Sequence, residues 1–266
     1  MRTLSILLAL GLATAALGGC GTTQLRDTSS MSIERVEERT ISPLRNIRVS
    51  GAIKVRVYYA PSSRIVIRSN SEERMRNLRA TSKGKTLLLS EQSKFRNTGR
   101  SYLVVEVYTS ELEELRAEEA SSIELLDRFD ARSLSVLGID GSQIAIDQLS
   151  DLTQLKLRLD GGCVLEAKAP LRAKRLDIRA EGSAIIRLGG EVERLNLGLS
   201  GASTLEGRGL LADKADIELE GSGLAKLEVG SSVSYSLSGA SRLHLYGSPR
   251  SVKGKASGAA RILQQH

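Results

Sequence analysis

Apolar and polar residues alternate in short runs through the second half of the chain. Residues 155–160 read Leu-Lys-Leu-Arg-Leu-Asp, and the same alternation recurs at 175–180 and 194–199. A period of two predicts a strand with one buried face. Each run is followed by a glycine, small residues and a shorter apolar stretch, such as Ile-Ile-Arg-Leu at 185–188. The repeating unit is therefore a strand, a glycine corner, a second strand and a loop.

The corner glycines recur at a nearly fixed interval, with successive steps of 20, 21, 19, 20, 18 and 19 residues. Such a period is typical of stacked repeat arrays. A repeat of this length holds two strands but no crossover helix. We therefore predict an all-β, single-stranded parallel β-helix whose rungs stack about 4.8 Å apart. The alternative is a meander sandwich of short antiparallel strands. The predicted corner glycines are Gly141, Gly161, Gly182, Gly201, Gly221, Gly239 and Gly258.

A less regular form of the pattern reaches further toward the N-terminus. Residues 119–123 fit the frame with Ala120 in the glycine position, although Leu115 and Ala117 form an inward pair that is one residue out of phase. We expect one domain at 44–266, with irregular strands over 44–114 and regular rungs over 115–263. Within the irregular part, the pattern predicts strands at 47–49, 53–57, 64–68, 86–90 and 103–107, a short helix at 71–78 and a polar loop at 91–101.

The first 19 residues have the composition of a secretory signal peptide. A short positive start precedes an apolar run over 4–17 that is too short to span a bilayer. The following Leu-Gly-Gly-Cys resembles the bacterial lipobox, which implies diacylglycerol on the Cys20 thiol, cleavage before it and acylation of the new amine. Several acyl chains anchor a protein stably to a membrane. The alternative is that Cys20 is an ordinary residue of a secreted protein. Gly21 stands where aspartate would retain a lipoprotein at the inner membrane of enteric bacteria. In a Gram-negative organism this favours the outer membrane, on either its periplasmic or its surface face.

The polar residues 20–43 are predicted to be a flexible tether, with some helix around 33–38. The formal net charge is +7, but basic and acidic residues are interleaved, so we expect a solvated surface and no nucleic-acid partner. Only 3% of the residues are aromatic, which suits thin rungs filled by aliphatic side chains. Cys163, the remaining cysteine, stands in a corner as a small, partly buried filler, with a reactive thiol as the alternative.

These features together resemble the bacterial head GIN domain family of auto-transporter adhesins. The resemblance covers roughly 44–262 and rests on the opening Arg-Asn-Ile-Arg-Val-Ser-Gly-Ala-Ile-Lys-Val at 45–55, on Gly-Lys-Thr-Leu at 84–87, and on the order and spacing of the later corners. It implies a right-handed β-helix and an envelope or surface role. It brings no catalytic residue with it. Asp160 and Glu181 depart from the family's usual Ser-Gly-Ser corner.

The residues that precede the corner glycines are expected to form an outward ladder. Three successive carboxylates in such a ladder could contact Ca²⁺ or a glycan, or act as an acid–base pair, whereas the structural alternative is hydrogen bonding to local backbone. His244 and Cys163 lack metal-ligand spacing, and no nucleophile elbow or phosphate loop appears, so we expect no cofactor, metal or catalytic residue. The acidic members of the ladder are Asp140, Asp160, Glu181 and Glu220.

The sequence therefore predicts a non-enzymatic cell-envelope lipoprotein, an adhesin-like or scaffolding module that presents a β-helix face to a protein or polysaccharide partner. The alternative is a glycan-active lyase or hydrolase that uses the acidic ladder. The last rung ends near Leu263 with little chain behind it, so its open edge is expected to allow self-association.

Overall fold

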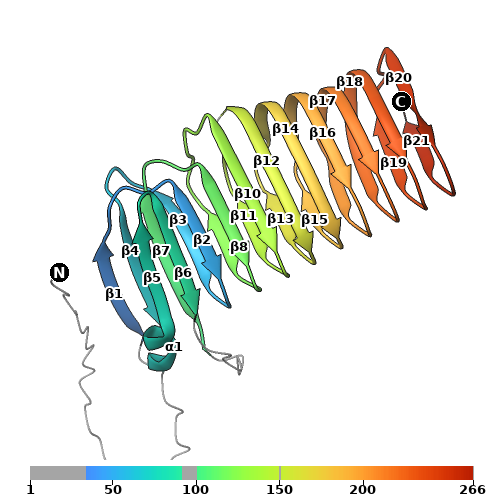
Figure 1. Ribbon diagram of the computed structural model, residues 1–266. Coiled ribbons are helices and arrows are strands. Elements are labelled where there is room, and N and C mark those ends of the chain that lie inside the picture. Colours follow the sequence, from blue (N-terminus) through green and yellow to red (C-terminus); the bar gives the residue numbers. More distant parts are fainter. Residues whose placement is uncertain (1–33, 92–100, 150, 266) are drawn as a thin grey trace, which may run out of the picture.

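The computed structural model describes residues 34–91, 101–149 and 151–265. Strand-built coils stack along one axis into an elongated solenoid, with α1 and β1 at one end and β20 and β21 at the other (Figure 1). The predicted signal peptide, Cys20 and most of the loop predicted at 91–101 lie outside the described residues. No helix in the described part of the chain has the length and hydrophobicity needed to cross a bilayer.

Each regular coil joins a long strand to a shorter one through a corner. Every strand pairs in parallel with its equivalent in the next coil. β17 and β18 run from one face of the solenoid into the other. The first face contains β8 (Glu114–Glu118), β10 (Ser133–Ile139), β12 (Leu152–Gly161), β14 (Leu171–Gly182), β16 (Gly190–Leu199), β17 (Thr204–Leu219), β18 (Leu224–Leu237) and β20 (Ser251–Ala256). The second contains β9 (Ser122–Leu125), β11 (Gln143–Ile146), β13 (Val164–Ala167), β15 (Ile185–Arg187), β19 (Arg242–Tyr246) and β21 (Arg261–Gln265).

The core consists of aliphatic columns that run along the stack. Leu157, Ile178, Leu197 and Ile217 occupy one inward position in four successive coils, and all four are buried. Because neighbouring strands are about 4.8 Å apart, each side chain packs on its equivalents above and below. The parallel β-helix prediction is confirmed, and the antiparallel sandwich is excluded.

The predicted corner glycines have the backbone conformation that their spacing suggested. All seven have φ between 70° and 80°, a region that opposes a Cβ atom. From Gly182 onward they also stack closely, because a Cβ on Gly221 would lie 2.9 Å from the carbonyl oxygen of Gly201. Ala120, in the predicted glycine position, has φ +58°.

The corners of the first two coils have the same length as the others, but each contains two successive residues with positive φ. Glu119 and Asp140 have positive φ and occupy the position that Gly161 fills in the next coil. Ala120 and Gly141 follow as a second positive-φ residue. The left-handed turn thus begins one residue earlier in these two corners. Aligning the first corner on Ala120 therefore places Leu115 and Ala117 one residue out of phase with the later coils, although both are fully buried.

The N-terminal region inserts its first coil out of sequence order. β2 (Asn46–Ser50) and β3 (Lys54–Tyr59) lie between β8/β9 on one side and β6 (Thr86–Glu91) with β7 (Leu103–Thr109) on the other. Three antiparallel strands then cover this end: β4 (Arg64–Ser69) on β7, β1 (Arg35–Thr40) on β4, and β5 (Leu78–Lys83) on β6. The predicted helix is α1 (Glu72–Asn77), with Ser71 as its N-cap.

One expectation for this region is wrong. Residues 35–40 form strand β1 rather than a helix, and they belong to the fold rather than to a tether that reaches residue 43. The backbone groups of β1 satisfy the open edge of β4, and this long-range pairing overrides the local helical preference of the Glu- and Arg-rich segment.

Candidate binding surface

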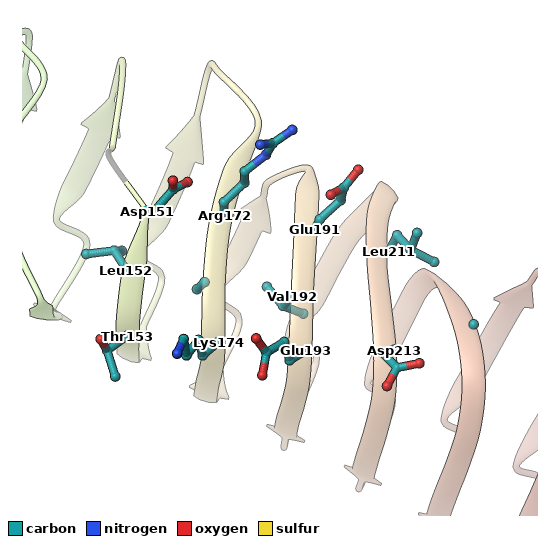
Figure 2. Close-up of a pocket in the computed structure, with 12 residues that line it drawn as sticks. Asp151, Leu152, Thr153, Arg172, Lys174, Glu191, Val192, Glu193, Leu211 and Asp213 are labelled. Atoms are coloured by element: carbon teal, nitrogen blue, oxygen red, sulfur yellow. The ribbon is translucent and has the colours of Figure 1, made fainter.

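A groove crosses several coils near the beginning of their long strands. Leu152 pairs with Ala173 and Gln154 pairs with Arg175, but the intervening Thr153 and Lys174 do not pair. The same interruption of the pairing occurs in the next two coils. The resulting bend leaves a hollow of about 530 Å³. Leu152 and Val192 point into the core beneath it (Figure 2).

Charged side chains of both signs line the two sides of the groove. One row reads Asp151, Arg172, Glu191 and Leu211, and the other reads Thr153, Lys174, Glu193 and Asp213 (Figure 2). All eight residues are exposed. Within the described part of the chain, the charged members form no ion pair with one another, although Asp213 accepts a hydrogen bond from the Ser231 hydroxyl. The exposed charges of the other members are therefore available to a partner.

The groove was not predicted from the sequence. Residues 151–153 and their equivalents at 172–174 precede the clear alternation and read as loop, because the bend breaks the period of two. Repetition of the short motif in consecutive coils is the one signal that could have revealed it, since 172–174 and 191–193 each place an apolar residue between two charged ones.

A second polar cluster lies on the long face around Asp177. Its carboxylate accepts hydrogen bonds from Asn196 (2.6 Å), Gln154 (2.7 Å) and Arg175 (2.9 Å). Burial raises the pKa of Asp177, but these hydrogen bonds and the Arg175 charge lower it more, so the pKa lies below its ordinary value of 3.8. The cluster borders a hollow of about 250 Å³, where Gly198 leaves space beside Arg179. Its donors and acceptors satisfy one another, which is the mark of a structural network.

The acidic ladder differs from the expectation in its register. Asp160 lies opposite Glu181, but its neighbour on the other side is Ile139, because Asp140 occupies the glycine column. The three consecutive carboxylates are thus reduced to two, and Glu220 is separated from Glu181 by a coil that carries Ser200. All four acids are exposed, and none of them lines the groove.

The remaining candidate residues lie outside the groove. Cys163 is fully buried, and its thiol donates to the carbonyl oxygen of Asp160 at 3.0 Å, so it fills the corner more completely than predicted. His244 stands between Lys226 and Leu263 in neighbouring coils. Within residues 34–91, 101–149 and 151–265, no group of three or more His, Cys, Asp or Glu side chains is placed to hold a metal ion.

A family model described as "Putative auto-transporter adhesin, head GIN domain" matches residues 43–249. The chain belongs to this family. Because head GIN proteins are described as adhesins, membership points to the cell envelope or surface and away from catalysis.

Solved structures share the head GIN fold at low sequence identity. A protein described as a putative adhesin from Parabacteroides merdae is 15% identical with a TM-score of 0.78, and the match covers 88% of this chain and 96% of that one. One described as a putative lipid binding protein from Parabacteroides distasonis is 18% identical with a TM-score of 0.73, covering 88% and 97% of the two chains. At these identities the likeness shows the fold alone. Comparison with curated proteins gives no match.

Proposed function

We propose that this head GIN protein is a non-enzymatic, lipid-anchored binding protein of the cell envelope whose groove receives a partner. The observation that carries the proposal is the groove itself, which presents exposed charges of both signs over an apolar floor from β12 to β17. Rigid strands hold these side chains at regular spacing, so the surface is preformed for an extended ligand.

A polypeptide suits this groove better than a neutral glycan. Arg172 and Lys174 belong to one coil, and Glu191 and Glu193 belong to the next, so a positive coil lies beside a negative one in the stack. An extended chain that carries both charges can match that order. None of the 12 lining residues is aromatic, so the groove offers no ring face for stacking against a sugar.

The placement of the acidic ladder supports a non-enzymatic role. Asp160 and Glu181, the adjacent pair of the acidic ladder, are exposed and lie outside the groove. A glycosidase instead holds two carboxyl groups on either side of the scissile bond of a bound sugar. Here, Asp160 and Glu181 lie side by side on paired strands of one face.

The lipid anchor is tested by replacing Cys20. The Cys20→Ala protein should leave the membrane fraction and appear in the soluble fraction, while a Cys163→Ala protein stays with the membrane. Protease treatment of intact cells then distinguishes the two faces. Loss of the protein while a periplasmic control survives indicates the cell surface, and survival until lysis indicates the periplasm.

Partner binding at the groove is tested by cross-linking in living cells. A photo-reactive residue at Leu211 should give a cross-linked product, whereas the same residue at Leu88, an exposed leucine of the N-terminal region, should not. In the protein with the photo-reactive residue at position 211, Arg172→Glu with Lys174→Glu should abolish the cross-linked product. The matched charge reversal on β12, Lys156→Glu with Arg158→Glu, should not affect it. No product at Leu211, or a product that is insensitive to the groove reversal, contradicts the proposal.

A further inference from the structure

The two ends of the solenoid are closed to different degrees. Antiparallel strands and α1 cover the N-terminal end (Figure 1). At the other end, among the described residues, β20 pairs only with β18 and β21 pairs only with β19. One side of each terminal strand therefore presents unpaired backbone groups. Val252 is 39% exposed, while Val233 in the same column of the preceding coil is 2% exposed. The apolar columns thus stop at this end without a cover.

Tyr235 closes only part of the opening. Its side chain occupies an inward position, and Gly254 lies beside it in the last coil. A Cβ on Gly254 would lie 2.6 Å from the Tyr235 ring, so glycine is what allows the ring to lie there. Ala256 and Val252, on either side, stay exposed. The terminal coil offers an apolar surface with a strand edge along it.

The same end carries most of the net positive charge of the protein. No Asp or Glu follows Glu228, although the segment 229–266 contains five Arg and Lys residues out of a net charge of +7 for the whole chain. All five are exposed, and none forms an ion pair within the described residues. These cations are Arg242, Arg250, Lys253, Lys255 and Arg261.

This charge opposes pairing between copies of the protein. Two β20 edges would bring Lys253 and Lys255 of each copy together. The β5 edge at the other end of the same face carries Arg79 and Lys83, so a head-to-tail contact along this face also meets like charge. Lysine on an edge strand discourages self-pairing in this way. Insertion into a bilayer is also disfavoured, because hydrocarbon leaves the unpaired backbone groups of a strand edge unsatisfied.

We propose that the C-terminal coil binds an extended segment of a partner protein by strand addition, and that this segment alternates acidic with apolar residues. Its apolar side chains extend the columns that end at Val252 and Ala256, and its acids face outward beside Lys253 and Lys255. The solenoid contains the same arrangement internally. Glu206 lies directly opposite Lys226 in the next coil, and their charged groups are 3.0 Å apart.

The protein's own sequence supplies a suitable probe. Residues 215–220 of β17 and its corner read Ala-Asp-Ile-Glu-Leu-Glu, with inward apolar and outward acidic positions. As a labelled peptide, this segment is as long as β20. Peptides with lysine in place of the three acids, or with alternate amides N-methylated on the pairing side, test charge and backbone pairing separately.

Binding of this peptide to the full chain purified in detergent is measured by fluorescence anisotropy. Lys253→Glu with Lys255→Glu should weaken binding at least tenfold, and both modified peptides should fail to bind. The matched control, Lys156→Glu with Arg158→Glu on the outer side of β12, should bind like the wild type. Circular dichroism checks the fold of each variant. Lys253→Gln with Lys255→Gln provides a second pair of substitutions, which removes the two charges without reversing them.

Three results would overturn the proposal. One is equal weakening of peptide binding by Lys253→Glu with Lys255→Glu and by Lys156→Glu with Arg158→Glu, which would show that only the net charge of the protein matters. A second is a wild-type dimer in sedimentation experiments, which would make the occupant another copy. A third is binding to phosphatidylglycerol vesicles that depends on the lysines while the peptide fails to bind. None of these results bears on the groove, because the groove lies on other coils and is tested by cross-linking from Leu211.

Discussion

Ala120 shows how strongly one backbone angle constrains a corner of this fold. Ala120 has a φ of +58°, a left-handed conformation that costs free energy for any residue with a Cβ atom. From Gly161 onward, the corner residue with positive φ is a glycine. The period of the repeat predicted Ala120 as the glycine equivalent. The sequence did not reveal that Glu119 and Asp140 also have positive φ, because that depends on how each corner stacks on the next.

Replacing Ala120 with glycine is therefore expected to stabilise the protein. The gain should be about 1 kcal/mol, since relief of the left-handed strain exceeds the added entropy of the unfolded chain. The melting temperature should rise by about 2–4 °C. Ala240→Gly is the control, because Ala240 is an exposed corner residue without positive φ. Equal shifts for the two variants would contradict this explanation.

Asp177 is expected to make stability depend on pH in the acid range. Its pKa is lower in the folded than in the unfolded protein, so its stabilising contribution is fully present above about pH 4 and is lost as the pH falls through the folded value. Urea unfolding at pH 7 and pH 3 should show a smaller pH-dependent loss for Asp177→Asn than for the wild type. Asp151→Asn, which removes an exposed carboxylate from the groove, serves as the reference. An unchanged loss for Asp177→Asn would rule out this role.

At the scale of elements, α1 is held in place by one buried ion pair. The Arg74 guanidinium donates to both carboxylate oxygens of Glu91 at 2.7 Å, and also to the carbonyl oxygens of Ala52 and Ser101. The two charged side chains are 2% and 3% exposed. Arg74 thereby joins the helix to β6, to the corner after β2 and to the segment that precedes β7. The sequence predicted the helix and its Ser71 cap, but an arginine on a short charged helix gives no sign of burial.

Removing this arginine should be far more costly than removing its neighbour. Arg74→Met leaves the Glu91 carboxylate buried without its counter-charge and should lower the free energy of unfolding by about 3–5 kcal/mol. Arg76→Met breaks a surface pair with Glu72, whose side chains are 68% and 50% exposed, and should cost less than about 0.5 kcal/mol. Chemical denaturation measures both. Similar values would show that the buried pair is not what secures α1.

At the scale of the whole molecule, the solenoid is a one-dimensional stack in which each coil depends on its neighbours. An interior coil is packed on both sides, whereas the coil formed by β20 and β21 is packed on one side only. Local stability should therefore fall toward the C-terminal end. This asymmetry matches the proposed strand addition, since a terminal coil that lacks a neighbour can accept one.

Hydrogen exchange should reveal this gradient. Amides of β20 and β21 are expected to exchange at least tenfold faster than those of β12 and β14, because less packing must be lost to open the terminal coil. Exchange followed by mass spectrometry resolves these segments. Adding the acidic peptide should slow exchange in β20 and leave β12 unchanged. Uniform protection along the solenoid would contradict the gradient.

The sequence by itself determined the repeating coil, its inward columns and its corner glycines. A period of two and a step near 20 residues are local properties that every coil repeats, as Leu157 and Gly182 illustrate. Tertiary structure alone decided the placement of β2/β3 out of sequence order, the docking of β1, the groove and the register of Asp140. These features depend on which backbone lies beside which, and strand pairing between distant segments is not encoded in local alternation.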